Sequence, residues 1–200
     1  IIGILASLLL PALAAAKNKA NAVKSRNNLT QIQRAISMWS GDNDGANPTY
    51  RNASYDPGYK QGGNWHNNFW YHKVFDYSAN AHKIILSPST TPDTRSWWGD
   101  DKRSWCAWNN VSKINSGRRV PGSYGFNGWN HPRGYMETEW RMQEPGDGNP
   151  SFHPLFADAN WVDMWPGEND PAPKNLQGYE TVPSMARVAI ARHGVYGPNA

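Results

Sequence analysis

The stretch IIGILASLLLPALAAAKNKANAVKSRNNLTQIQRAISMWSG, residues 1–41, decides the fold of this 200-residue chain. Its first sixteen residues are uncharged, and the rest mixes basic and amide side chains with regularly spaced apolar ones. Neither proline nor glycine interrupts the stretch between Ala12 and Ser40, so the sequence predicts one continuous helix. About forty helical residues extend roughly 60 Å, too far for a compact domain of this size. We therefore expect the apolar half to project from a globular part.

The second half of this helix carries an apolar stripe at spacings mainly of three and four residues, which places the stripe on one face. We expect this face to pack on the globular part. The residues expected to make the contact are Val23, Leu29, Ile32, Ile36 and Trp39. The turn sequence Asp42-Asn43-Asp44-Gly45 then predicts the end of the helix.

The apolar half falls slightly short of the ~20 residues that span a membrane. Its basic residues follow the apolar run, whereas those of a secretory signal precede it, so we expect a few further apolar residues before Ile1. Because Gly3 and Pro11 both weaken a helix, we expect regular hydrogen bonding to be lost between them. The residues expected to pack against other copies of this segment are Ile1, Ile2, Ile4, Leu5, Leu8, Leu9, Leu10, Pro11 and Leu13.

Charge is divided unequally along the chain. The net charge is +4, but residues 1–41 contain five basic and no acidic residues, whereas residues 42–200 carry 15 basic and 16 acidic ones. The positive charge is thus a property of the helix, and it does not indicate a generally basic, nucleic-acid-binding protein. Three hypotheses account for the basic residues: they contact lipid headgroups, DNA, or acidic groups of neighbouring copies. The slight excess of acidic residues in 42–200 favours the third.

The remainder predicts a loop-rich part around a small antiparallel sheet, because 18 glycines and 15 prolines favour turns. Strands are expected at 105–108, 123–129, 153–156 and 188–190, and a short helix and a strand within 69–77 and 84–86. The predicted fold class is α+β, with an apolar membrane or filament-core segment at 1–16, an amphipathic helix at 17–41 and a tryptophan-rich globular domain at 42–200.

Several segments resemble one protein family. IIGILASLLLPALAAAK and NNLTQIQRAISMWSGDNDGANP look like the N-terminal helix of type IV pilin-like proteins, closest to a pseudopilin-like branch common in planctomycete and verrucomicrobial lineages. GSYGFNGW at 122–129, PLFADANWVDMWP at 154–166 and ARHG at 191–194 resemble the C-terminal region of that branch. A histidine there is followed by an Asp-Gly pair; His193 matches the histidine, but no Asp-Gly follows it up to Ala200.

The resemblance implies a structural subunit, not an enzyme, that polymerises through its N-terminal helix into an extracellular filament. It also implies that the inner membrane holds the subunit before assembly, with a prepilin peptidase and a filament assembly machinery as partners. The basic leader, the methylated Phe and the Glu of the family have no counterpart in residues 1–200.

Other functions are weighed from the residues themselves. Eleven tryptophans suggest, as an alternative, a membrane-tethered monomeric carbohydrate-binding module, or else simply fill the core. The pair expected to be exposed is Trp97-Trp98, beside Asp100 and Asp101. No GxSxG, HExxH, GxxxxGK[ST] or GxGxxG motif occurs, so no enzymatic constellation is predicted. The single cysteine, Cys106, excludes a disulfide scaffold.

No cofactor is required by this interpretation, and neither a glycan nor a nucleic acid is indicated as a partner. Loop carboxylates nevertheless supply the hard oxygen ligands that calcium prefers. The candidate calcium ligands are Asp158, Asp163, Glu168 and Asp170. Asn52 and Asn110 stand in N-glycosylation sequons and are candidate glycosylation sites.

Overall fold

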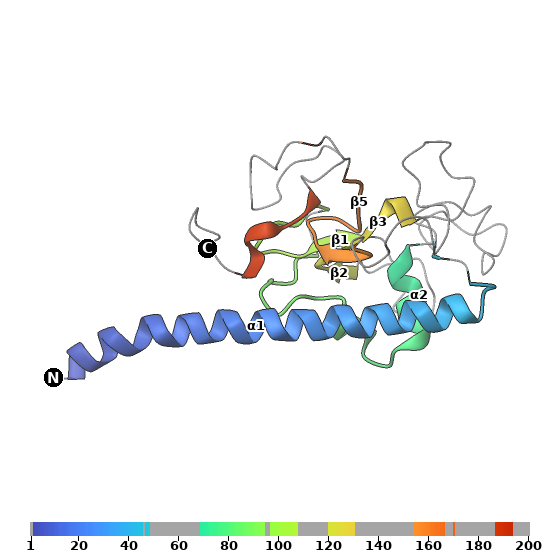
Figure 1. Cartoon of the computed structure of the whole chain (residues 1–200). Helices are drawn as coiled ribbons and strands as arrows, with labels where there is room; N and C mark the ends of the chain where they lie inside the picture. Colours follow the sequence, from blue (N-terminus) through green and yellow to red (C-terminus); the bar gives the residue numbers. More distant parts are fainter. Residues whose placement is uncertain are drawn as a thin grey trace.

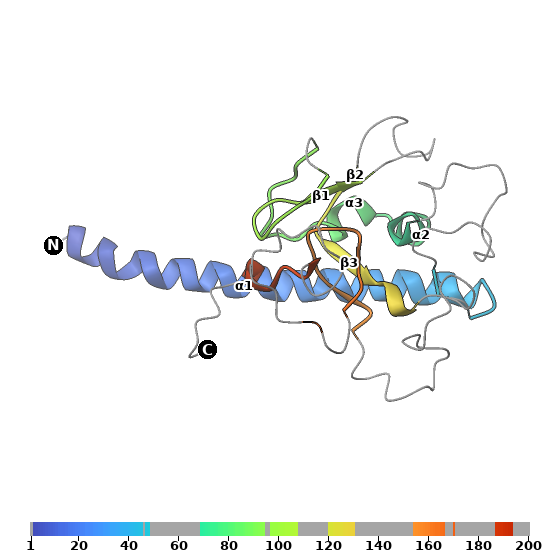
Figure 2. The same cartoon turned by 90° about the horizontal axis from the view of Figure 1, so that it is seen from above.

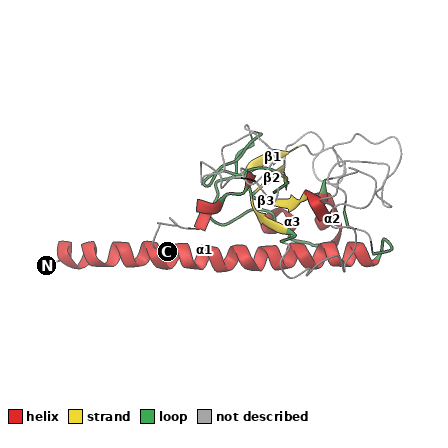
Figure 3. Cartoon of the chain, turned by 45° about the horizontal axis from the view of Figure 1, so that its top comes forward, coloured by secondary structure: helices red, strands yellow, loops and turns green. Residues whose placement is uncertain are grey.

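A computed structural model of the chain describes residues 2–45, 47–48, 69–94, 97–107, 120–130, 154–166, 170 and 187–193. Within these residues the fold is α+β, with a long N-terminal helix beside a globular part of short helices and small sheets (Figure 3). The candidate residues Ile1, Asn52, Asn110 and Glu168 lie outside the described residues.

The long helix α1 (Ile2–Gly41) runs along the globular part with its second half and projects with its first half (Figure 1, Figure 2). It passes through Gly3 and Pro11 without a break, so the expected loss of regular structure there is wrong for this chain. A proline removes only one helical hydrogen bond, and the turns on either side continue the ladder. Among the described residues, no helix has a stretch apolar and long enough to cross a membrane.

The end of α1 is formed by the predicted turn. The Gly45 amide donates to the Ser40 carbonyl at 2.9 Å, and the Asn43 side chain donates to the Trp39 carbonyl at 2.7 Å. Asp44 and Gly45 both have positive φ, the left-handed conformation that commonly terminates helices. Carbonyl groups of the last helical turn thereby gain partners, and the chain leaves the helix axis.

The apolar residues in the second half of α1 are buried in part and exposed in part. Ile32, Ile36 and Trp39 are buried, and Leu29 is half-buried against the same cluster. Val23, in contrast, is 54% exposed, so its expected contact with the globular part is wrong. Val23 precedes Ile32 by nine residues, which at 3.6 residues per turn places it on the opposite side of the helix.

Short helices cover the buried face of α1. The helices α2 (Trp70–Tyr77) and α3 (Ala81–Ile84) pack directly against it, together with the 3₁₀ turn η6 (Ile190–His193). A sheet was the expected partner, and a strand was expected at 84–86; both expectations are wrong. The sheet reaches α1 instead through the side chain of Tyr124.

The strands form two small sheets rather than one. β1 (Trp105–Ala107) pairs antiparallel with β2 (Val120–Gly122). β3 (Tyr124–Asn127) lies between β4 (Phe156–Asp158), which is antiparallel to it, and β5 (Asp163–Met164), which is parallel. The second sheet is therefore mixed, where an antiparallel one was expected. Near residue 188 only a single bridge, Ala159 to Val188, takes the place of the expected strand.

Aromatic side chains fill the core. Trp70 and Trp105 are fully buried, and their indole N–H groups donate to the Val162 carbonyl at 2.7 Å and to the Tyr124 carbonyl at 3.1 Å. Trp105 lies opposite Gly122, where any Cβ would overlap its ring. The other fully buried aromatic side chains are Phe69, Tyr71, Tyr124 and Phe126. These two tryptophans are thus core residues with satisfied polar groups.

Truncation of Ile36 tests how α1 is held. Ile36→Ala is expected to lower the free energy of unfolding by about 2–5 kcal/mol, because it opens a cavity between α1 and the globular part. The matched change Val23→Ala, on the exposed side of the same helix, is expected to cost less than about 0.5 kcal/mol. Denaturant titration followed by tryptophan fluorescence measures both. Equal losses would contradict the division of α1 into a buried and an exposed side.

Removal of residues 1–16 is expected to leave a soluble, folded monomer, because the buried side chains that the structure describes on α1 all lie after Val23. Near-UV circular dichroism and size-exclusion chromatography measure this. A fragment that precipitates, or one without a near-UV spectrum, would show that the first half of α1 is needed for the fold.

Candidate functional site

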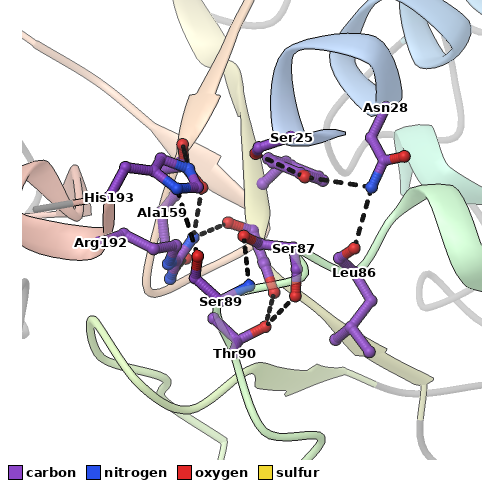
Figure 4. A network of polar contacts seen from close by, with 12 residues as sticks. Ser25, Asn28, Leu86, Ser87, Ser89, Thr90, Ala159, Arg192 and His193 are labelled. Carbon is purple, nitrogen blue, oxygen red and sulfur yellow. Dashed lines mark hydrogen bonds and ion pairs between the residues drawn. The ribbon is translucent and has the colours of Figure 1, made fainter. Parts of the chain in front are cut away.

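Two features of the described chain stand out: a polar junction inside the molecule and an apolar surface on the projecting helix. The junction joins α1, the segment 85–90, the β3–β4 pair and η6 (Figure 4). We define the polar junction as Ser25, Asn28, Ser87, Ser89, Thr90, Ser123, Tyr124, Asp158, Arg192 and His193.

Arg192 is the centre of the junction. Its buried guanidinium donates to the Asp100 carbonyl at 2.8 Å, to the Ala159 carbonyl at 2.9 Å and to the Ser123 carbonyl. It also forms an ion pair with Asp158 at 3.1 Å. Loops far apart in the sequence therefore meet at one cation, and a buried charge is acceptable there because it has both a counter-ion and hydrogen-bond acceptors.

Three side chains next to Arg192 contact one another in series: Ser89, His193 and Asp158. His193 Nε2 is 3.0 Å from Asp158 Oδ2, and His193 Nδ1 is 3.3 Å from Ser89 Oγ. The residue types are those of a hydrolytic triad. The serine contact is long, however, and the second oxygen of Asp158 is held by Arg192. We interpret the three residues as a structural link that ties η6 to the segment containing Ser89.

The junction reaches α1 through two small polar residues. Ser25 Oγ and Tyr124 Oη share a hydrogen bond of 2.7 Å. The Asn28 amide donates to the Leu86 carbonyl at 3.1 Å and to Tyr124 Oη at 3.4 Å. Burial raises the pKa of Tyr124, so its hydroxyl stays neutral at physiological pH. Any rotation of α1 about its axis would leave these buried groups without partners.

The described candidate calcium ligands, Asp158, Asp163 and Asp170, are not assembled into one site. Asp158 is paired with Arg192, as described above, and Asp163 is fully buried with Arg187 Nη1 at 2.6 Å and the Trp165 indole as a further donor. Burial raises the pKa of Asp163, although the Arg187 charge opposes this. Within the part of the chain that the structure describes, no group of His, Cys, Asp or Glu side chains could hold a metal ion.

The tryptophan pair expected on the surface is half-buried. Trp97 and Trp98 both pack against the hydrophobic core. The ring centres of Trp98 and Trp161 lie 4.9 Å apart. The Arg187 guanidinium also contacts Trp98, at 5.4 Å from its ring centre. The expectation of an exposed pair is therefore wrong, because these rings and Arg187 cover one another.

The projecting half of α1 exposes large apolar side chains on all its sides. Those described in full are between 65% and 85% exposed: Ile2, Leu8, Leu9, Leu10 and Leu13. Consecutive residues point about 100° apart around a helix, so the run 8–10 alone covers most of its circumference. Ile4 and Leu5 belong to the same helix, but their side chains lie outside what the structure describes. An exposed apolar surface of this extent marks an interaction site.

Removal of the Arg192 side chain tests the junction. Arg192→Ala is expected to lower the free energy of unfolding by about 3–5 kcal/mol, because Asp158 and three carbonyl groups lose a buried partner. Arg103 pairs with Asp100 near the surface, and its side chain is 46% exposed. The control Arg103→Ala is therefore expected to cost at most about 1 kcal/mol. Denaturant midpoints give both values, and a mild Arg192→Ala would contradict the central place of this residue.

The chain was compared with protein families, curated proteins and solved structures. No family model, no curated protein and no solved structure matches it.

Proposed function

We propose that this chain is the structural subunit of a type IV pilin-like helical filament and polymerises through the first half of α1. The observation that carries the proposal is the exposure of Ile2, Leu8, Leu9, Leu10 and Leu13 around the whole circumference of a projecting helix. A side of the helix that served only the chain's own fold would be covered by the globular part, as Ile32 and Ile36 are.

The energetics favour other copies of the same segment as the cover. Full burial of a leucine side chain contributes about 1.5–3 kcal/mol, and each copy brings several. A helix that is apolar all round needs neighbours on several sides, and one partner covers only one side. Identical head-to-tail contacts, repeated by a rotation and a rise, produce an open helical polymer.

The globular part is then carried on the outside of the filament. The second half of α1 is attached to it by the buried face and the polar junction, so both halves of the helix move as one body. We propose that the inner membrane holds the subunit before assembly and that the filament is extracellular, with a prepilin peptidase and an assembly machinery as partners. The resemblance of the N-terminal helix to type IV pilin-like proteins supports this part of the proposal.

A charge placed in the apolar half tests the proposal. Leu9→Asp is expected to abolish filaments, because an unpaired carboxylate in the filament core costs several kcal/mol per copy. Gln33→Asp adds the same charge to an exposed polar position of the same helix and is the control that should still assemble. Negative-stain electron microscopy shows the filaments, and near-UV circular dichroism shows that each variant folds. Normal filaments from Leu9→Asp, or a reconstruction with residues 2–13 on the outer surface, would refute the filament.

A further inference from the structure

The middle of α1 carries a basic band, defined here as Lys17, Lys19, Lys24 and Arg26, all of them exposed. Residues 1–41 contain no acidic residue, so no partner at i+3 or i+4 neutralises these charges within the helix. Among the described residues, none of the four forms an ion pair with an acidic side chain.

The far end of the same helix is acidic. Asp42 and Asp44 follow its last turn, and Asp76 lies at the end of α2, which packs beside it; all three are exposed. We call these three residues the acidic end. The Tyr77 hydroxyl donates to Asp42 at 2.8 Å, and this hydrogen bond, together with the charges of Asp42 and Asp76, raises the pKa of Tyr77.

The helix itself adds to the negative potential at this end, because the C-terminus of a long helix carries a partial negative charge. Lys73 of α2 is largely buried nearby, with its ammonium 5.1 Å from the centre of the Trp39 ring. The three exposed carboxylates of the acidic end therefore outnumber this buried ammonium.

The basic band cannot meet Asp42 or Asp44 within one molecule. From Lys24 to Asp42 the helix rises about 27 Å, and from Lys17 it rises further. Side chains of lysine and aspartate together bridge only a fraction of this distance, and α1 is unbroken between the two regions. Contact between them requires a second copy that is displaced along the helix axis.

We propose that, in the filament, the basic band of one copy docks against the acidic end of the next, with an axial displacement of about 30 Å. The inference rests on the proposed function. Apolar burial along residues 2–13 is non-directional and does not by itself fix how far one helix slides past another. Opposite charges at a fixed separation on each copy do fix this register, and they disfavour a side-by-side arrangement that would bring two basic bands together.

The occupant is a second copy because this chain supplies both halves of the contact. The basic band is the positive part of a chain whose remaining residues are slightly negative. A lipid surface or a nucleic acid would use the basic band and leave the acidic end without a role. A staggered copy uses both regions.

Zero-length cross-linking of wild-type filaments tests the contact directly. A carbodiimide joins lysine amines to carboxylates only where the two touch. Peptides that join Lys17, Lys19 or Lys24 to Asp42 or Asp44 are expected by mass spectrometry, and the unbroken helix makes each of them intermolecular. Unassembled full-length chain in detergent, treated in the same way, is expected to give none.

Charge reversal supplies the second arm. Lys24→Glu and Asp76→Lys are each expected to cause a several-fold loss of filament yield at low salt, and the double variant is expected to restore the yield. Lys83→Glu, which makes the same change of charge on the exposed side of α3, is the control that should assemble like the wild type.

The outcomes separate the two proposals. Wild-type filaments without these cross-links, or single reversals that assemble like Lys83→Glu, would overturn the stagger and leave the filament standing. A loss in Lys24→Glu that Asp76→Lys does not restore, together with Lys24-dependent binding of anionic phospholipid vesicles, would also overturn it in favour of a lipid contact. Absence of wild-type filaments would refute the proposed function itself.

Discussion

The burial of one face of α1 is the constraint on which the rest of the structure depends. Ile32, Ile36 and Trp39 are buried where α2 and α3 pack against α1. Since α1 is a single unbroken helix, holding its second half also sets the direction of its first half. The projecting apolar segment is thus aimed by contacts that lie some tens of ångströms away from it.

Polar contacts fix the rotation of α1 about its axis, which apolar burial alone does not fix. A hydrophobic face tolerates small rotations of a helix, whereas Ser25 and Asn28 keep their buried hydrogen bonds with Tyr124 and Leu86 in one orientation only. Tyr124 belongs to β3, and the adjacent carbonyl of Ser123 accepts a bond from Arg192. Helix orientation, sheet and C-terminal 3₁₀ turn are therefore linked through two neighbouring residues.

Local features of this chain could be predicted from its sequence, and non-local ones could not. The continuity of α1 from Ala12 onward, its end at the Asp42–Gly45 turn and strands at Trp105 and Tyr124 follow from spacing and turn chemistry, whereas its continuation through Gly3 and Pro11 does not. The expectation for Val23 was wrong because its spacing of nine residues from Ile32 places it outside the stripe that Leu29, Ile32, Ile36 and Trp39 share. The helix α3 was missed because four residues carry too little periodicity to distinguish helix from strand.

The candidate site shows the same division. The exposed run at 8–10 follows from composition alone, whereas Arg192 contacts partners 33 to 92 positions away in the sequence, which no local pattern predicts. Trp97 and Trp98 were expected on the surface because their neighbours in sequence are polar, yet Trp161 and Arg187 cover Trp98 from distant segments. Sequence thus indicates what the helix exposes, and the tertiary contacts decide which way it faces.

Cys106 has a consequence for any assembly of this chain. It is the single cysteine among the 200 residues, and it is fully buried in β1 between Trp105 and Ala107. A thiol without access to solvent neither exchanges with other disulfides nor becomes oxidised while the fold is intact. While the fold is intact, Cys106 therefore offers no thiol for a disulfide between two copies of this chain.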